Sequence, residues 1–77
     1  METKFKKHQI VKLTASPDKE YVEYNFSEID EEVPIKPGMK AKINMILPNG
    51  QYHVEILDKK DKVIAYVMIN EEALEEI

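Results

Sequence analysis

The 77-residue sequence contains neither cysteine nor arginine, and it has only two glycines. Without cysteine, neither a disulfide framework nor a thiolate metal site can support the small core. Without arginine, the chain lacks the side chain that most often binds bases and phosphates through two parallel hydrogen bonds. Its glycines, Gly38 and Gly50, both lie in turn-like contexts, so no glycine-rich phosphate loop is present. These absences disfavour nucleotide and nucleic-acid recognition.

Long apolar runs are also missing. No segment approaches the ~18 residues of a membrane span, and the first eight residues lack the apolar stretch of a signal peptide. We therefore expect no membrane association and a cytoplasmic location. The net charge of −4, from 15 acidic and 11 basic residues, would repel a phosphate backbone unless the basic residues are segregated.

The length predicts a single domain over residues 1–77. A chain this small buries only about 60–65% of its unfolded surface, so its core is thin and a deep active site is disfavoured. A hydrophobic fraction of 43% with 34% charged residues is typical of a folded domain with a solvated exterior. Such a domain is better suited to docking onto something larger.

Three apolar-rich runs between Val33 and Ile69, separated by turn signals, predict an antiparallel meander. Pro37-Gly38 has the residue order of a type II turn, and Asn49-Gly50 is a strong hairpin signal. The first run alternates and predicts one core face made of Met39, Ala41, Ile43 and Met45; the second predicts another made of Tyr52, Val54 and Ile56. The last run, residues 62–69, is apolar on both faces, so another segment must cover it.

The two ends of the chain are expected to complete the fold. Imperfect alternation over residues 5–13 predicts a strand near a sheet edge, with Val11 and Leu13 on one face. At the other end, Asn70 is expected to cap a helical turn through Glu76, returning Leu74 and Ile77 to the core.

Residues 14–36 form a long connection that is rich in aromatic and acidic side chains. Residues 21–26 hold three of the six aromatic residues and alternate, with Val22, Tyr24 and Phe26 on one side, which predicts a short strand or the arm of a loop hairpin. Ser27 is expected to cap a helical turn through the acidic residues that follow. In one interpretation the aromatic side chains fold under the barrel and the acids are its solvated side. In the other interpretation the aromatic and acidic side chains together form a recognition surface, since long loops on rigid scaffolds often carry function. The candidate partner-binding residues are Tyr21, Glu23, Tyr24, Glu28, Asp30, Glu31 and Glu32.

Catalytic and metal-binding patterns are weak in this sequence. The two histidines, His8 and His53, are far apart, and His53 with Glu55 supplies only two ligands on one strand face. The acids of residues 28–32 lack the spacing of a calcium loop. We therefore expect no enzymatic activity, no metal and no cofactor. The alternative function is a nucleic-acid or ribonucleoprotein accessory module that uses Lys40, Lys42 and Lys62 on one sheet face.

The order of elements resembles an SH3-like barrel: a small antiparallel barrel of about five strands, with a long first loop and a short C-terminal helical turn. In detail, residues 35–43, 51–56 and 63–67 resemble a family of small uncharacterised bacterial proteins with Gly-x-x-Gly-x-Val and Tyr-x-Val-Glu-Phe strands. Ala41 stands in place of that family's second glycine, and Ile56 in place of its phenylalanine. The resemblance implies an antitoxin, immunity or inhibitor role.

The leading hypothesis is thus a non-enzymatic module that binds a larger protein, such as a toxin, a nuclease or a nucleic-acid-binding protein, through its acidic and aromatic loop. Direct nucleic-acid binding is disfavoured by charge. A third, structural hypothesis is a homo-oligomer that pairs exposed edge strands.

Overall fold

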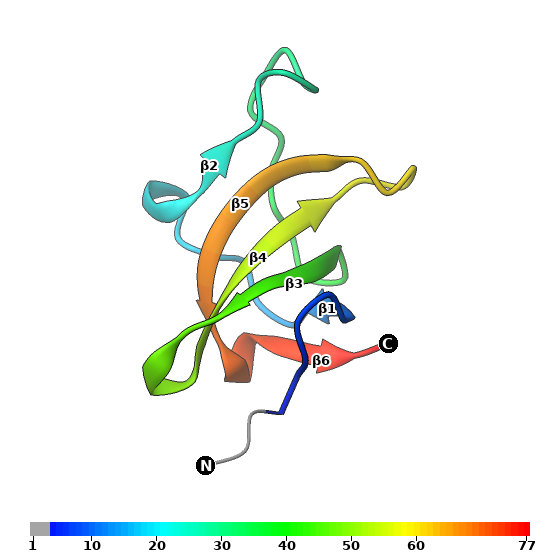
Figure 1. Cartoon of the computed structure of the whole chain (residues 1–77). Coiled ribbons are helices and arrows are strands. Elements are labelled where there is room, and N and C mark those ends of the chain that lie inside the picture. The colour runs from blue at the N-terminus through cyan, green and yellow to red at the C-terminus, as the bar shows by residue number, and fades with distance from the viewer. Residues whose placement is uncertain (1–3) are drawn as a thin grey trace.

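The computed structural model describes residues 4–77; residues 1–3, which belong to the segment predicted to lack a signal peptide, lie outside the described residues. The fold is one sheet of six antiparallel strands (Figure 1). The strands are β1 (Ile10–Leu13), β2 (Glu23–Tyr24), β3 (Lys40–Ile46), β4 (Gln51–Leu57), β5 (Val63–Asn70) and β6 (Leu74–Glu76). Three single 3-10 turns join them: η1 (Lys19–Tyr21), η2 (Pro48–Gly50) and η3 (Glu71–Ala73).

The strands lie in the sheet in the order β2-β5-β4-β3-β1-β6. The first and last strands of the chain, β1 and β6, are therefore neighbours. In Figure 1 the sheet curls strongly, and β5 arches over the long loop between β1 and β3. A strand, a long loop, a three-stranded meander, a 3-10 turn and a last strand paired with the first define a small SH3-like barrel. The predicted fold class is confirmed. The short strand expected within residues 21–26 is β2, and β6 adds one strand to the predicted five.

The central meander formed as predicted because its turns carry the required residues. Gly38 has a φ of +93° and follows Pro37, and the Met39 amide donates to the Lys36 carbonyl oxygen, as a type II turn requires. Asn49 and Gly50 also have positive φ, at +68° and +73°, in the tight connection between β3 and β4. Local turn chemistry therefore set the strand boundaries.

The predicted core face of β3 was wrong at one position. Ala41 and Ile43 are fully buried, but Met45 is 53% exposed. The register of β3 against β4 shifts between Ile43 and Met45, so a bulge at Asn44 places Met45 on the outer face. A bulge depends on the pairing of two strands, and alternation within one strand does not reveal it.

The C-terminal prediction was also partly wrong. Only the single turn η3 is helical, and the Asn70 side chain does not cap it but accepts a hydrogen bond from Gln51 Nε2 at 3.1 Å. The following residues pair with β1 as β6, which buries Leu74 and leaves Ile77 72% exposed. Pairing with the edge of β1 gives residues 74–76 more backbone hydrogen bonds than a frayed helical turn would provide.

The core is formed by the inner faces of the strands and, on β5, also includes Ile64. Phe5, which precedes β1 and lies in no strand, is fully buried and packs edge-to-face on Tyr52 at 5.7 Å between ring centroids. Ile64, on the second face of β5, is 3% exposed, and Ile29 of the long loop packs against the core. The loop thus covers the core at the end of β5 that carries Ile64, whereas Met68 toward the other end is 56% exposed. Over residues 4–77, no helix is long and apolar enough to span a membrane.

Candidate functional site

The long loop, residues 14–39, is closed at its base by the strands that flank it. The Leu13 amide donates to the Met39 carbonyl at 2.9 Å, and the Gly38 amide donates to the Leu13 carbonyl at 2.7 Å. These two bonds hold the ends of the loop together, so its middle is presented by a fixed base rather than by a free tether.

Asn25 fixes the middle of the long loop to the sheet. Its side-chain Nδ2 donates to the Val63 carbonyl at 2.9 Å, and its backbone amide donates to the Ile64 carbonyl at 2.8 Å. Its Oδ1 accepts the Ser27 amide, and its carbonyl accepts the amides of Glu28 and Ile29. The expected helical turn capped by Ser27 is therefore wrong, because Asn25 organises a tight turn in its place.

The aromatic residues of the loop divide between core and surface. Tyr24 is half-buried on the core, and its hydroxyl donates to the Val33 carbonyl at 2.7 Å. Tyr21 and Phe26 are 67% and 59% exposed. Tyr24 thus packs on the core as the first interpretation expects, and the recognition surface of the second stays a prediction, with Tyr21 exposed.

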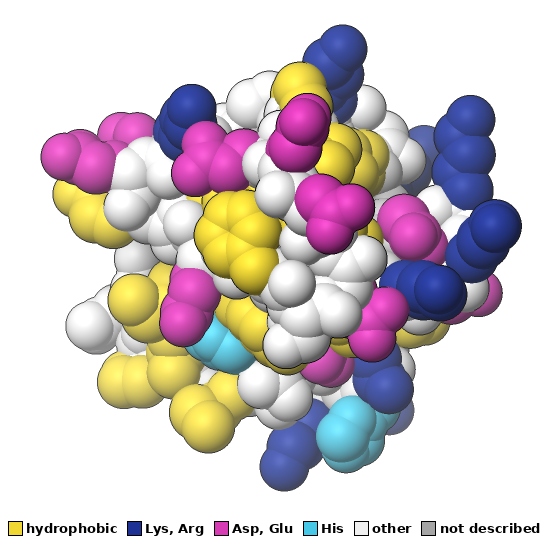
Figure 2. All heavy atoms as spheres, turned by 90° about the horizontal axis from the view of Figure 1, so that it is seen from above, with side chains coloured by type: hydrophobic (Ala, Val, Ile, Leu, Met, Phe, Trp, Pro, Cys, Tyr) yellow, Lys and Arg dark blue, Asp and Glu magenta, His cyan; other side chains and the backbone are white. Residues whose placement is uncertain are grey.

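The acidic residues of the loop are all exposed. Glu32 pairs with Lys19 at 3.1 Å. Within the described part of the chain, no salt bridge is formed by Glu28, Asp30 or Glu31, which we call the acidic cluster. Figure 2 views the molecule from the side where this loop lies, and acidic side chains are prominent there, with lysines around the rim. The cluster is uncompensated negative charge near the exposed ring of Phe26.

The candidate residues do not form one continuous pocket. Tyr24 and Glu32 line a shallow hollow of about 270 Å³ together with Lys19 and Val33. Tyr21 borders a different hollow, of about 320 Å³, against Met68 of β5. The structure therefore brings Tyr24 and Glu32 together and places Tyr21 at a separate hollow.

Phe26 was missed by the sequence reasoning. Alternation placed it on one side with Val22 and Tyr24, but the chain turns at Asn25, and the ring of Phe26 is exposed, with its centroid 6.1 Å from that of Tyr24. The signal in the sequence was Asn25-Phe26-Ser27 itself, because asparagine followed by serine two residues later is typical of a turn.

A larger cleft, of about 720 Å³, lies between the long loop and the turn that joins β4 to β5. Its apolar lining includes Ile29, Met39, Leu57 and Ile64. On the side of the β4–β5 turn, Asp58 and Lys59 also line the cleft.

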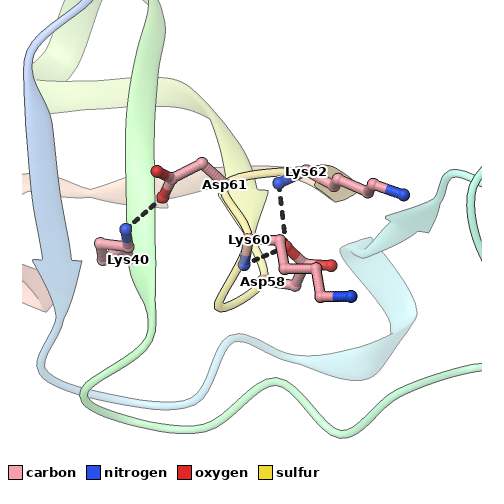
Figure 3. Close-up of polar contacts among 5 residues, drawn as sticks. All are labelled: Lys40, Asp58, Lys60, Asp61 and Lys62. Atoms are coloured by element: carbon pink, nitrogen blue, oxygen red, sulfur yellow. Dashed lines mark hydrogen bonds and ion pairs between the residues drawn. The ribbon is translucent and has the colours of Figure 1, made fainter.

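The lysines of the alternative function do not form one binding face. Lys40 pairs with Asp61, and Lys42 lies directly opposite Glu55 on the neighbouring strand. Figure 3 shows the side chain of Lys62 directed away from Lys40, on the other side of the turn. An acidic residue therefore accompanies each of the two strand lysines.

The shifted pKa values mark structural ties rather than a reactive centre. Burial raises the pKa of Tyr52, whose hydroxyl donates to Glu71 Oε2 at 2.6 Å, and that same hydrogen bond lowers the pKa of Glu71. The pKa of Asp58 is lowered chiefly because its carboxylate accepts the backbone amide of Lys62 (Figure 3). No group of three or more His, Asp or Glu side chains suited to a metal ion occurs in residues 4–77.

Comparison with known proteins adds no assignment. The chain matches no protein-family model, no curated protein and no solved structure. The fold class therefore rests on the topology of the strands, and the function on the geometry of the surface.

Proposed function

We propose that this chain is a non-enzymatic protein-binding module that docks its long loop onto a basic surface of a larger protein. The observation that carries the proposal is the acidic cluster of Glu28, Asp30 and Glu31, which is exposed and free of salt bridges within the described residues. Uncompensated charge of one sign on a fixed loop speeds association with a partner of opposite charge.

The loop is also suited to specific recognition because little of it needs to be ordered on binding. Its base is closed by Leu13 and Gly38, and Asn25 ties its middle to β5. A surface that is already fixed loses less conformational entropy when it binds. Phe26 supplies an exposed aromatic ring beside the charges, and aromatic side chains are common anchors in interfaces.

The biological role that fits best is inhibition in the cytoplasm: an antitoxin, immunity or anti-defence protein that covers a basic groove on a toxin, a nuclease or another nucleic-acid-binding protein. Such a groove carries cations to bind phosphates, and a carboxylate cluster can occupy it in their place. The alternative, an accessory module that binds nucleic acid through Lys40, Lys42 and Lys62, is disfavoured because Asp61 and Glu55 lie against the first two.

The test is a quantitative affinity capture from source-cell extract with three baits. The first is the natural protein, and the second carries Glu28→Gln, Asp30→Asn and Glu31→Gln. The third is a control that removes three exposed charges elsewhere, Glu72→Gln, Glu75→Gln and Glu76→Gln, of which Glu75 also loses its ion pair with Lys12. All three substitutions in each variant are at exposed positions, so circular dichroism should show the native fold in every bait.

The proposal expects a partner with a basic surface that is enriched by the natural and control baits and is lost with the acidic-cluster variant. It is wrong if every enriched protein binds the acidic-cluster variant as well as it binds the natural chain. If instead the enriched material is RNA or DNA, and nuclease treatment removes it, the lysine-based alternative is correct.

A further inference from the structure

Three side chains with metal-binding chemistry lie in one row across the outer face of the meander. In the sheet register, Met45 of β3 is opposite His53 of β4, and His53 is opposite Met68 of β5. Directly opposite residues in antiparallel strands project from the same face, with Cβ atoms about 4.5–5.5 Å apart. Two thioethers therefore flank one imidazole.

The bulge at Asn44 creates this row. Ile43 pairs with Val54 on the buried face, and without the extra residue Asn44 would face His53. The shift brings Met45 to the outer face, where it is 53% exposed, and Met68 on the far side is 56% exposed. Bulges commonly re-aim a side chain in this way.

The imidazole of His53 is held from two sides. Its Nδ1 lies 3.1 Å from the Asn44 amide, and its ring stacks on Tyr66 with planes 18° apart and centroids 6.0 Å apart. Across residues 4–77, no group hydrogen-bonds its other nitrogen, Nε2. A metal-ligating histidine donates its other ring N–H to an acceptor, so ligation through Nε2 places the proton on Nδ1. The Asn44 side-chain amide then turns so that its oxygen, in place of Nδ2, faces Nδ1 and accepts that proton.

The ligand types select a soft monovalent ion. Thioether sulfur favours Cu(I), and imidazole also binds copper, whereas hard divalent ions prefer carboxylates and water. Glu55 lies one row away, opposite Tyr66 and Lys42, so it belongs to a different set of contacts. Methionine is flexible enough for both sulfurs to turn toward the open nitrogen between them.

We propose that Met45, His53 and Met68 form a binding site for Cu(I), with Ag(I) as its redox-inert analogue. Asn44 is a positioning residue that orients the imidazole. The step is coordination alone, with no electron transfer, and it does not depend on the proposed protein-binding function of the long loop.

The first experiment is a titration of the protein, labelled with ¹³C at the methionine methyl groups, with Ag(I) in chloride-free buffer. The methyl signals of Met45 and Met68 should shift and saturate at one ion per chain. The signal of Met39, which packs against the core beneath the long loop, is an internal control and should not move. A parallel titration with Zn(II) should leave all three signals in place.

Variants then test each ligand by competition with a colorimetric Cu(I) chelator under reducing conditions. Met45→Leu and Met68→Leu keep the side-chain volume, and each should weaken binding at least tenfold, as should His53→Ala. Asn44→Ala should weaken it by about tenfold to a hundredfold, the usual effect of losing a group that orients a ligand. Met39→Leu and His8→Gln are the matched controls and should leave affinity unchanged.

The proposal is wrong if Ag(I) leaves the Met45 and Met68 signals unshifted. It is equally wrong if His53→Ala binds as tightly as the natural chain, because the site would then be a pair of adventitious thioether contacts. Since all three positions lie on the outer face, circular dichroism of the variants separates loss of binding from loss of fold.

Discussion

Replacing Phe5 by alanine should destabilise the protein far more than its position suggests. Phe5 lies outside every strand, yet its side chain is fully buried and packs edge-to-face on Tyr52. Removing a buried phenylalanine costs about 3–5 kcal/mol, of which the aromatic pair contributes roughly 0.5–1.5 kcal/mol. At roughly 0.05–0.15 kcal/mol per residue, a chain of 77 residues has about 4–12 kcal/mol of stability in total. Phe5→Ala should therefore remove a large share of the free energy of unfolding.

Urea unfolding followed by far-ultraviolet circular dichroism measures this loss. Phe26→Ala is the matched control, because it deletes the same side chain from a position that is 59% exposed, and it should cost less than about 1 kcal/mol. Phe5→Leu, expected to cost about 1–2 kcal/mol, keeps the test informative if the alanine variant does not fold. Equal costs for Phe5→Ala and Phe26→Ala would refute the reasoning, since they would mean that residues 4–9 are not part of the core.

Three further predictions concern the turns and the loop. Gly38→Ala should lower the free energy of unfolding by about 1–2 kcal/mol in the same urea assay. A φ of +93° strains any residue with a Cβ, even though no atom lies within 4 Å of the added carbon. An unchanged urea midpoint would contradict this prediction. Asp58→Asn should make the melting temperature fall less steeply as the pH is lowered into the acid range. The folded pKa of Asp58 lies below its unfolded value of 3.8, so its stabilisation is present above that pH and is lost as the pH falls through the folded pKa. Identical melting curves against pH for both proteins would exclude that contribution. Asn25→Ala should detach the long loop from β5. Amide hydrogen exchange should then be faster at residue 25 and at neighbouring Ser27 and Glu28, with exchange in β4 unchanged. Equal exchange rates in both proteins would show that the hydrogen bond to Val63 does not hold the loop.

Much of the fold could be predicted because the decisive signals are local. Gly38 and Asn49 lie where positive φ is required, and alternation in β4 correctly placed Tyr52, Val54 and Ile56 in the core. The run of apolar residues in β5 implied a cover, which holds for Ile64 but not for the exposed Met68.

The failures share one physical cause, which is dependence on a partner strand. The bulge that exposes Met45 exists only in the register of β3 against β4. The segment from Leu74 to Glu76 has no strong strand pattern of its own, and it extends because β1 offers unpaired backbone groups. Sequence periodicity describes one segment at a time, so neither feature was visible in it.

The candidate site was foreseen in composition but not in arrangement. The acids of residues 28–32 are exposed as the recognition hypothesis requires, but the division of Tyr21, Tyr24 and Phe26 between separate surfaces follows from the hydrogen bonds of Asn25 to β5. The row of Met45, His53 and Met68 was hidden for the same reason as the bulge. The sequence showed only His53 with Glu55, because the two methionines are brought to that histidine by strand pairing.

The central claim is that the acidic cluster binds a protein, and the most direct measurement is the dissociation constant of the purified partner at two salt concentrations. The natural chain should bind more weakly at the higher salt, because exposed charges are screened. The variant with Glu28→Gln, Asp30→Asn and Glu31→Gln should bind at least tenfold more weakly at low salt and show little salt dependence, while the control at Glu72, Glu75 and Glu76 should match the natural chain. Equal affinity of the acidic-cluster variant and the natural chain at both salt concentrations would contradict the proposed function.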